Sequence, residues 1–353
     1  MSLDLKPKKW AGALREVTLG AGSRRTVTVG GGNGLPLHTF EAAFPHRPAL
    51  ALEITDVDPV RWVESVRQPW EGVLGRPAEA ARRAVEEFGA DLLLVHLMGT
   101  HPDRGNRSPE QAAADVGAVL EAVPVPLIVK GSGAGQKQND VLARVAESCR
   151  GEGLALHSAT NEDYKTLAAV AVAYGHVLVG ESPIDVNIAK QINILLADAN
   201  VDLNRVLIDP LTGGLGYGLE YSYSVMERIR LAALGGDTML NCPIVCLVGE
   251  EAWKAKEARV SVDKEPLWGS QPERGIHWEV ATAMTLIEAG AEVLVLRHPE
   301  ALARIRKQVD SWFGETPLPD APLSERSHDR EGVIDLKRPT LQGREPSGGA
   351  PCR

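Results

Sequence analysis

One repeating unit of the fold can be followed in "DLLLVHLMGTHPDRGNRSPEQAAADVGAVLEAVPVPLIVK", residues 91–130. The apolar runs 91–97 and 126–130 lack strict alternation, which is typical of parallel strands buried on both faces. Between them, Ser108, Pro109 and Gln111 stand at the positions of an N-cap, a first helical residue and a capping-box partner. The stretch therefore predicts a strand, a polar loop, a helix and a second strand.

The same rhythm recurs along most of the chain. Eight short apolar runs, separated by polar loops and helical patterns, occupy residues 49–54, 91–97, 126–130, 154–158, 176–180, 205–209, 243–248 and 292–297. Pro77 opens one of the helical patterns and Gly89 ends it, while Ser182-Pro183 with Asp185 predicts another helix start. Eight strand–helix units over about 250 residues match an α/β fold of the (β/α)₈ TIM-barrel type. No G-x-G-x-x-G follows the first run, as an open dinucleotide-binding sheet would require.

Two further segments flank the predicted barrel, which spans residues 49–316. Within residues 1–48, two β-rich runs around "GAGS" (20–23) predict a β-hairpin. Residues 317–353 are rich in Pro, Gly, Ser and charge, so we expect an extended or disordered tail.

Composition excludes several classes of protein. The 353 residues carry a formal net charge of −9 and no basic run, which argues against a nucleic-acid partner. No apolar stretch approaches the roughly 20 residues of a membrane span, and the N-terminus has no signal-peptide core, so we expect a cytoplasmic protein. The four cysteines, Cys149, Cys242, Cys246 and Cys352, are too few and too scattered for a disulfide framework or an iron–sulfur cluster.

The C-terminal ends of barrel strands carry the chemistry of TIM barrels. The residues at or just after the predicted strands are polar throughout: Glu53, Thr55, Asp56, His96, Thr100, His101, Asp103, Arg104, Lys130, Ser132, His157, Thr160, Asn161, Glu181, Ser182, Asp209, Glu250, Arg297 and His298. Glu181, Asp209 and Glu250 form either a general acid/base set or a set of loop anchors, and spacing leaves both readings open. His96, His101 and Asp103 resemble part of a metal site, but the further ligands that zinc or iron needs are missing, and Asp103 could pair with Arg104 or Arg107. We therefore predict no metal ion.

The loop "DPLTGGLGYGLEYS" (209–222) follows the sixth predicted strand. It lacks the Lys-Ser/Thr ending of a phosphate-binding Walker loop. Its glycines would let the backbone approach something flat or bulky, and Tyr217 and Tyr221 offer aromatic faces. A simple turn is the alternative.

Several long blocks carry a resemblance to a known family. They are "GGGNGLPLHTFE" (30–41), "GTHPDRGNRSPEQAA" (99–113), "YGHVLVGESPIDVNIAKQINILL" (174–196), "IDPLTGGLGYGLEYSYSVMERIRLAAL" (208–234), "VGEEAWKAKEA" (248–258), "RGIHWEVATA" (274–283) and "AGAEVLVLRHP" (289–299). In this order the chain resembles, from about residue 16 to about 310, the small (delta) subunit of the corrinoid iron–sulfur protein of the carbon monoxide dehydrogenase/acetyl-CoA synthase system.

The resemblance implies a TIM barrel paired one-to-one with a large (gamma) subunit, which holds a [4Fe–4S] cluster and the corrinoid (cobalamin), with no cluster in this chain. The pair would accept a methyl group from methyltetrahydrofolate or a methanopterin relative, through a separate pterin methyltransferase. It would deliver that group to acetyl-CoA synthase in the reductive acetyl-CoA (Wood–Ljungdahl) pathway of carbon fixation in anaerobes. The barrel would cap the corrinoid and have no turnover alone.

A corrin is large and fringed with amides, so small hydrogen-bonding residues and close backbone are expected around it. The residues that the resemblance places toward the corrin or the partner are His101, Arg104, Ser132, Gly133, Thr160, Asn161, Ser182, Asp209, Thr212, Gly213, Tyr217 and Glu250. Two alternatives remain: a methyltransferase that binds pterin through Asp56, Asn161 and Asp209, and a purely structural scaffold subunit.

Overall fold

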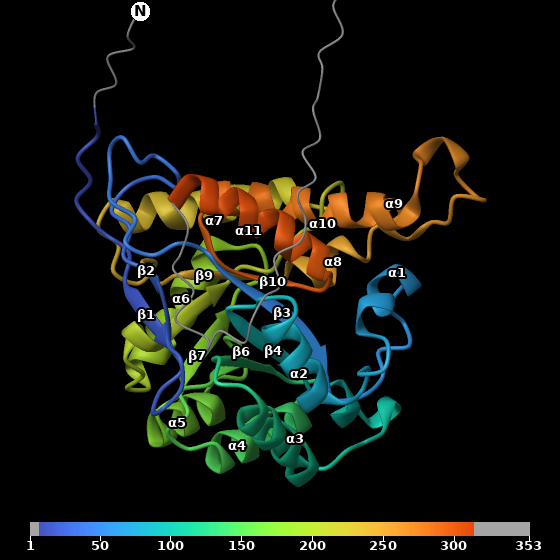
Figure 1. Cartoon of the computed structure of the whole chain (residues 1–353). Coiled ribbons are helices and arrows are strands. Elements are labelled where there is room, and N and C mark those ends of the chain that lie inside the picture. The colour runs from blue at the N-terminus through green and yellow to red at the C-terminus, as the bar shows by residue number, and fades with distance from the viewer. Residues whose placement is uncertain (1–6, 314–353) are drawn as a thin grey trace, which may run out of the picture. The chain divides into compact units, whose positions relative to one another are not determined.

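Eight parallel strands close into a barrel in the computed structural model, which describes residues 7–313 (Figure 1). In barrel order the strands are β10 (Ala291–Leu296), β3 (Ala49–Thr55), β4 (Leu92–His96), β5 (Leu127–Lys130), β6 (Ala155–Ala159), β7 (Val177–Glu181), β8 (Val206–Asp209) and β9 (Ile244–Cys246). Each of the eight predicted apolar runs overlaps one of these strands. The prediction of a (β/α)₈ barrel is therefore confirmed.

A β-hairpin of β1 (Glu16–Leu19) and β2 (Val27–Gly30) precedes the barrel, as predicted. Its side chains Val17, Leu19 and Val29 are fully buried in the same cluster as the residues that fill the barrel interior. The hairpin therefore closes the N-terminal end of the barrel.

The barrel interior is layered because strand side chains alternate with a period of two. Its apolar part consists of Ala49, Ala51, Leu92, Leu94, Ile128, Ala155, Val177, Val179, Leu207, Val245, Leu247, Val293 and Val295. On seven of the eight strands, all but β9, the interior position two residues further on is Glu53, His96, Lys130, His157, Glu181, Asp209 or Arg297. We call these seven residues the ionisable layer. It lies at the C-terminal end of the barrel.

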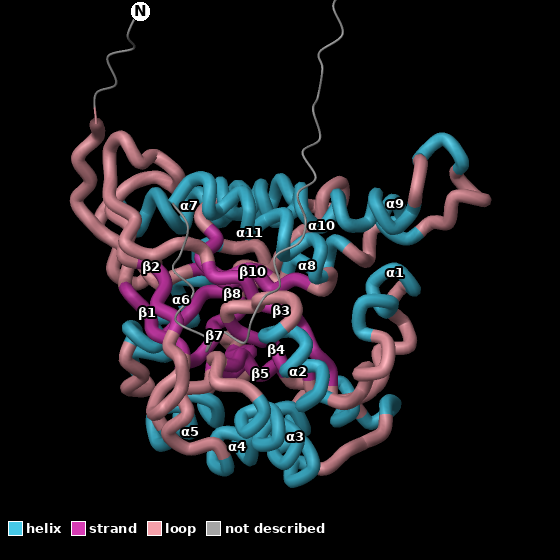
Figure 2. Tube along the Cα trace, in the orientation of Figure 1, coloured by secondary structure: helices cyan, strands magenta, loops and turns pink. Residues whose placement is uncertain are grey.

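Helices surround the strands (Figure 2). The long ones are α2 (Pro77–Glu86), α3 (Pro109–Ala122), α4 (Gln136–Ser148), α5 (Lys165–Tyr174), α6 (Val186–Asp198), α7 (Leu219–Leu234), α10 (Gln271–Glu288) and α11 (Pro299–Phe313); the short ones are α1 (Glu64–Arg67), α8 (Val248–Ala252) and α9 (Lys256–Arg259). Helix α3 begins with the predicted capping box, in which Ser108 and Gln111 each accept a hydrogen bond from the other's backbone N–H. None of the described helices is long and apolar enough to cross a membrane.

Two sequence predictions about element boundaries were wrong. Helix α6 begins at Val186 rather than after Ser182-Pro183, because the Asp185 carboxylate accepts the N–H groups of Asn187 and Ile188 and is the N-cap. The seventh apolar run, predicted as a strand to residue 248, already enters α8 at Val248. Glu250 therefore lies on a helix.

Three cysteines within the described part are buried and free: Cys149, Cys242 and Cys246. Burial raises the pKa of Cys242 to about 12, so its thiol is a poor source of a thiolate ligand. The predicted tail, 317–353, and Cys352 within it lie outside the described residues.

Candidate functional site

The ionisable layer divides into groups, of which the first joins the three neighbouring strands β10, β3 and β4. Arg297 Nε lies 2.5 Å from Glu53 Oε2, and His96 Nδ1 lies 2.8 Å from Glu53 Oε1. Burial alone would raise the pKa of Glu53, but the charge of Arg297 and the contact with His96 outweigh it and hold the pKa well below the usual range. Glu53 is therefore a fixed anion.

Glu279, on α10, holds the backbone at the end of β10, next to this group. Its fully buried carboxylate accepts hydrogen bonds from Arg297 N (2.6 Å), His298 N (3.2 Å) and Trp253 Nε1 (2.8 Å). Burial raises the pKa of Glu279 to about 7, against the opposing effect of these donors. The carboxylate fixes the end of β10 and so the position of Arg297.

A second group pairs Lys130 of β5 with Glu250 of α8 through a short ion pair. Burial would raise the pKa of Glu250, but the Lys130 ammonium lowers it to about 2. Glu250, which the sequence leaves as either an acid/base group or an anchor, is thus an ion-paired carboxylate at the barrel mouth.

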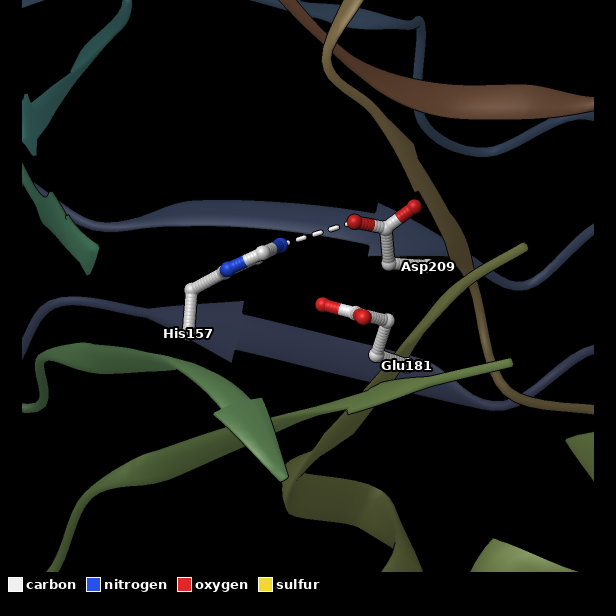
Figure 3. Close-up of side chains that lie close together, drawn as sticks. All are labelled: His157, Glu181 and Asp209. Atoms are coloured by element: carbon white, nitrogen blue, oxygen red, sulfur yellow. Dashed lines mark hydrogen bonds and ion pairs between the residues drawn. The ribbon is translucent and has the colours of Figure 1, made fainter. Parts of the chain in front are cut away.

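The third group brings together the ends of β6, β7 and β8 (Figure 3). His157 Nε2 lies 2.7 Å from Asp209 Oδ2, and both side chains are buried. Glu181 points toward this pair and accepts a hydrogen bond from Ser158 Oγ. Within the described part of the chain, neither Glu181 nor Asp209 has a Lys or Arg in ion-pairing distance, in contrast to Glu53 and Glu250.

One ligand atom from each of these three residues lies within 4.8 Å of the others. An imidazole and two carboxylates are suitable ligands for a divalent transition metal. The set also suits recognition of N–H donors, because neither carboxylate has a Lys or Arg partner among residues 7–313. The sequence prediction of no metal considered His96, His101 and Asp103, which the structure does not bring together in this way.

The glycine-rich loop after β8 packs mainly against its own chain. A Cβ on Gly213 would lie 2.3 Å from the carbonyl oxygen of Gly218, and one on Gly214 would lie 3.1 Å from that of Glu251. Glycine is therefore required at these two positions by contacts within the chain itself. The expected approach of the backbone to a flat ligand is not needed to explain it. Tyr217 is 54% exposed and donates its hydroxyl to Glu257, while Tyr221 is 63% exposed. Both tyrosines are available at the surface.

Comparison with known proteins decides the family. The family model described as the CO dehydrogenase/acetyl-CoA synthase delta subunit matches residues 16–306. The chain belongs to this family. Subunit delta of the acetyl-CoA decarbonylase/synthase complex of Archaeoglobus fulgidus is 38% identical over 87% of this chain and 70% of its own length. The corresponding subunit of Methanothermobacter thermautotrophicus is 33% identical over 93% and 82%.

Solved structures agree on the fold of this delta-family chain. A dihydropteroate synthase from Coxiella burnetii, in complex with pteroic acid, aligns with a TM-score of 0.51 at 15% identity, covering 78% of this chain and 97% of that one. The dihydropteroate synthase of Thermus thermophilus aligns with a TM-score of 0.50 at 19% identity, covering 84% and 98%. At these identities the likeness shows a shared barrel fold.

The twelve site residues expected from the sequence all follow strands β4 to β9 of the delta-family barrel. His101 and Arg104 follow β4; Ser132 and Gly133 follow β5; Thr160 and Asn161 follow β6; Ser182 follows β7; Asp209 ends β8, with Thr212, Gly213 and Tyr217 beyond it; Glu250 lies on α8. Asp103 pairs with neither arginine: its Oδ2 lies 3.8 Å from His101 Nδ1, which accepts the Asp103 backbone N–H, and Arg107 pairs with Asp115 instead.

Four of these twelve carry a buried polar atom without a hydrogen-bond partner among residues 7–313. The atoms are Ser132 Oγ, Asn161 Oδ1, Ser182 Oγ and Thr212 Oγ1. They follow four successive barrel strands, β5 to β8. Buried polar groups are normally paired, so this arc of the rim has unused hydrogen-bonding capacity.

The sequence placed most of the twelve expected residues in the loops, and it did not show that the strand-end residues form one layer inside the barrel. Of its seven members, only Asp209 was among the twelve expected residues. The other six were recognised as strand-end residues. What was not used is their spacing from the interior residues, which decides whether a side chain points into the barrel. Each lies an even number of residues after an apolar interior residue such as Leu94 or Val179, so its side chain points into the barrel.

Proposed function

We propose that this chain is the small subunit of a corrinoid iron–sulfur methyl carrier in an acetyl-CoA decarbonylase/synthase-type complex. Its partner would be a large subunit that holds the [4Fe–4S] cluster and the corrinoid. The pair would carry a methyl group from methyltetrahydrofolate, or a methyltetrahydropterin, to acetyl-CoA synthase in the reductive acetyl-CoA pathway. Family membership over residues 16–306 and the names of the relatives support this assignment.

The observation that carries the proposal for the barrel mouth is the arc of four unpartnered polar atoms after β5 to β8. A corrin presents amide groups around its whole edge, so a row of hydroxyl and amide groups on neighbouring loops suits it chemically. These residues fit the group. When bound, the corrinoid supplies a cobalt that accepts and releases the methyl group.

In this proposal the chain's own residues bind and orient rather than react. Ser132, Asn161, Ser182 and Thr212 bond the corrin edge, and the exposed Tyr217 meets the corrin or the large subunit. Glu181, which has no Lys or Arg within ion-pairing distance in residues 7–313, accepts an N–H group from the corrin amides, and Asp209 holds His157 and the Leu211 N–H in place beside it. The remaining expected residues, His101, Arg104, Gly133, Thr160, Gly213 and Glu250, complete the contact surface.

The alternative pterin site draws less support from the geometry. Both carboxylate oxygens of Asp56 already accept the Gly99 N–H, at 2.9 and 3.2 Å, and Arg107 donates to the Asp56 carbonyl. Asp56, one of the three residues assigned to that site, therefore already holds a loop of this chain.

The test is co-expression with the large subunit encoded by the same organism, purification and a visible absorption spectrum. We expect a one-to-one complex with corrinoid and iron–sulfur bands. The double variant Ser182→Val/Thr212→Val should keep the complex but release corrinoid faster, by about tenfold for a loss of ~1.4 kcal/mol. The variant Ser261→Ala, at an exposed serine, is the control.

Two results would overturn the proposal. A colourless lone chain that binds methyltetrahydrofolate would make it a pterin methyltransferase. A complex whose corrinoid is retained equally by wild type and the Ser182/Thr212 variant would make it a scaffold.

A further inference from the structure

Three side chains at the ends of β6, β7 and β8 share a small space inside the barrel (Figure 3). Asp209 is fully buried, His157 is 3% exposed, and Glu181 is partly buried. One ligand atom from each lies within 4.8 Å of the others. Two carboxylates and one imidazole are therefore held close together, largely away from water.

The charge of this group is not balanced by the residues around it. Within residues 7–313, neither carboxylate has a Lys or Arg at ion-pairing distance, whereas the other carboxylates of the ionisable layer each face an arginine or a lysine. Two carboxylates that share a buried place disfavour each other's charge. A proton on His157 would offset only one of the two negative charges. A divalent ion would offset both and would leave the imidazole neutral, as a ligand must be.

Hydrogen bonds from outside the group hold both carboxylates in place. Asp209 Oδ1 accepts the N–H of Leu211 at 2.9 Å, so Oδ2 stays on the side of His157, 2.7 Å from Nε2. The Ser158 hydroxyl donates to Glu181 Oε2. Outer hydrogen bonds of this kind orient the ligands in metal sites. Ligand atoms bound at about 2.1 Å to one ion lie roughly 3–4 Å apart, so side-chain shifts of under about 1 Å bring all three atoms to a common ion.

The group is open toward the barrel mouth. On its other side the barrel is filled by the buried residues Ala155, Val179 and Leu207, each two positions before a member of the group. The partial exposure of Glu181 is therefore toward the C-terminal end of the barrel. An ion can enter from this end, and three protein ligands leave a further coordination position open to it.

We propose that His157, Glu181 and Asp209 bind one divalent transition-metal ion, with a remaining coordination position that faces the barrel mouth. The imidazole favours a transition metal such as Zn²⁺ over Mg²⁺ and Ca²⁺, which take oxygen ligands. The proposal concerns the chain alone and does not depend on the corrinoid assignment. In the proposed complex, a corrin amide would compete with the ion for Glu181.

Zn²⁺ is the probe, and isothermal titration calorimetry of the tag-free full chain, freed of metal with a chelator, measures its binding. We expect one ion per chain, which millimolar Mg²⁺ does not displace. Glu181→Gln keeps the size of the side chain and removes one charged ligand. Since loss of an outer hydrogen-bond partner already weakens metal binding 10–100-fold, this variant should weaken it by at least about 100-fold. Glu162→Gln, the same substitution at an exposed position in the loop after β6, is the matched control and should bind as wild type does.

X-ray absorption at the zinc edge identifies the ligands in the wild type, so this measurement stands even if Glu181→Gln fails to fold. We expect nitrogen and oxygen ligands at about 2.0–2.2 Å and no sulfur.

Three results would overturn the proposal. Absence of stoichiometric Zn²⁺ binding would show that protons balance the charge of the group. A sulfur ligand would place the ion at a cysteine, and equal affinity of wild type and Glu181→Gln would place it elsewhere on the chain. None of these results bears on the corrinoid assignment, which the absorption spectrum of the co-expressed complex tests.

Discussion

His157 and Asp209 meet across an intervening strand: their side chains come from β6 and β8, and Nε2 lies 2.7 Å from Oδ2 inside the barrel. A second hydrogen bond, from Leu211 N to Asp209 Oδ1 at 2.9 Å, fixes the carboxylate from the loop side. One buried residue thus ties the interior of the barrel to the glycine-rich loop at its mouth.

Replacing Asp209 should destabilise the fold according to how many acceptors are lost. Asp209→Ala leaves His157 and the Leu211 N–H without an acceptor, so we expect a loss of about 3 kcal/mol in the free energy of unfolding. Asp209→Asn keeps one acceptor, and the imidazole can change tautomer, so the loss should be about 1 kcal/mol. Urea denaturation measures both, with Asp198→Ala at an exposed position as control. Equal losses for the two Asp209 variants would contradict this account.

Arg297→Met should lower the free energy of unfolding by about 3–5 kcal/mol at neutral pH, because it leaves the buried Glu53 carboxylate without its main partner. The pKa of Glu53 is held below its ordinary value of 4.5, so its stabilising effect is present above pH 4.5 and lost as pH falls. The difference in unfolding free energy between wild type and variant should therefore shrink on acidification. Adding Glu53→Gln should remove most of the cost. A difference that is constant with pH would show that Glu53 is not the group responsible.

Glu279 should give the opposite dependence on pH. Its pKa is raised from 4.5 to about 7 by burial, so the folded chain holds this proton more tightly than the unfolded chain. The resulting stability is full below pH 4.5 and is lost as pH rises through about 7. Urea denaturation from roughly pH 5 to 8 should show a steeper fall for wild type than for Glu279→Gln. Glu288→Gln, at an exposed position of the same helix, should follow wild type.

Gly249 of α8 lies where a side chain has no room. A Cβ there would be 2.6 Å from Arg297 N and 2.8 Å from Glu279 Oε1, so Gly249→Ala should cost about 1–3 kcal/mol and disturb the Glu279 anchor. Gly117 lies within α3 and a Cβ would meet nothing within 4 Å. Gly117→Ala should therefore stabilise the chain by about 0.5–1 kcal/mol. Thermal unfolding of the two variants tests this prediction. A change of Tm in the same direction for both variants would contradict it.

The sequence was sufficient to predict the barrel because the signal is repeated. Eight apolar runs and one complete capping box at Ser108 report local burial and local hydrogen bonds, which neighbouring residues determine. The start of α6 was mispredicted because local capping signals do not decide between two caps that lie close together. Ser182 and Asp185 are both good caps, and Ile184, at a φ of +45°, breaks the helix between them in a way that composition does not reveal.

The site was harder to predict because its partners are distant in sequence. Lys130 and Glu250 are 120 residues apart, and only the closed barrel brings them together. The position of each residue after a predicted strand indicated that both lie at the barrel mouth, but it did not indicate that they form an ion pair.

The link between Glu53 and Arg297 has a consequence for synthesis of the chain. The two residues are 244 positions apart, and they join the first barrel strand made, β3, to the last, β10. On the ribosome, β3 has an unpaired edge and Glu53 has no cation until almost all of the described chain has emerged. Contacts of such long range form late and leave intermediates open to aggregation. A nascent chain stalled before Arg297 would therefore be a substrate for chaperones or proteases, whatever the integrity of its remaining strands.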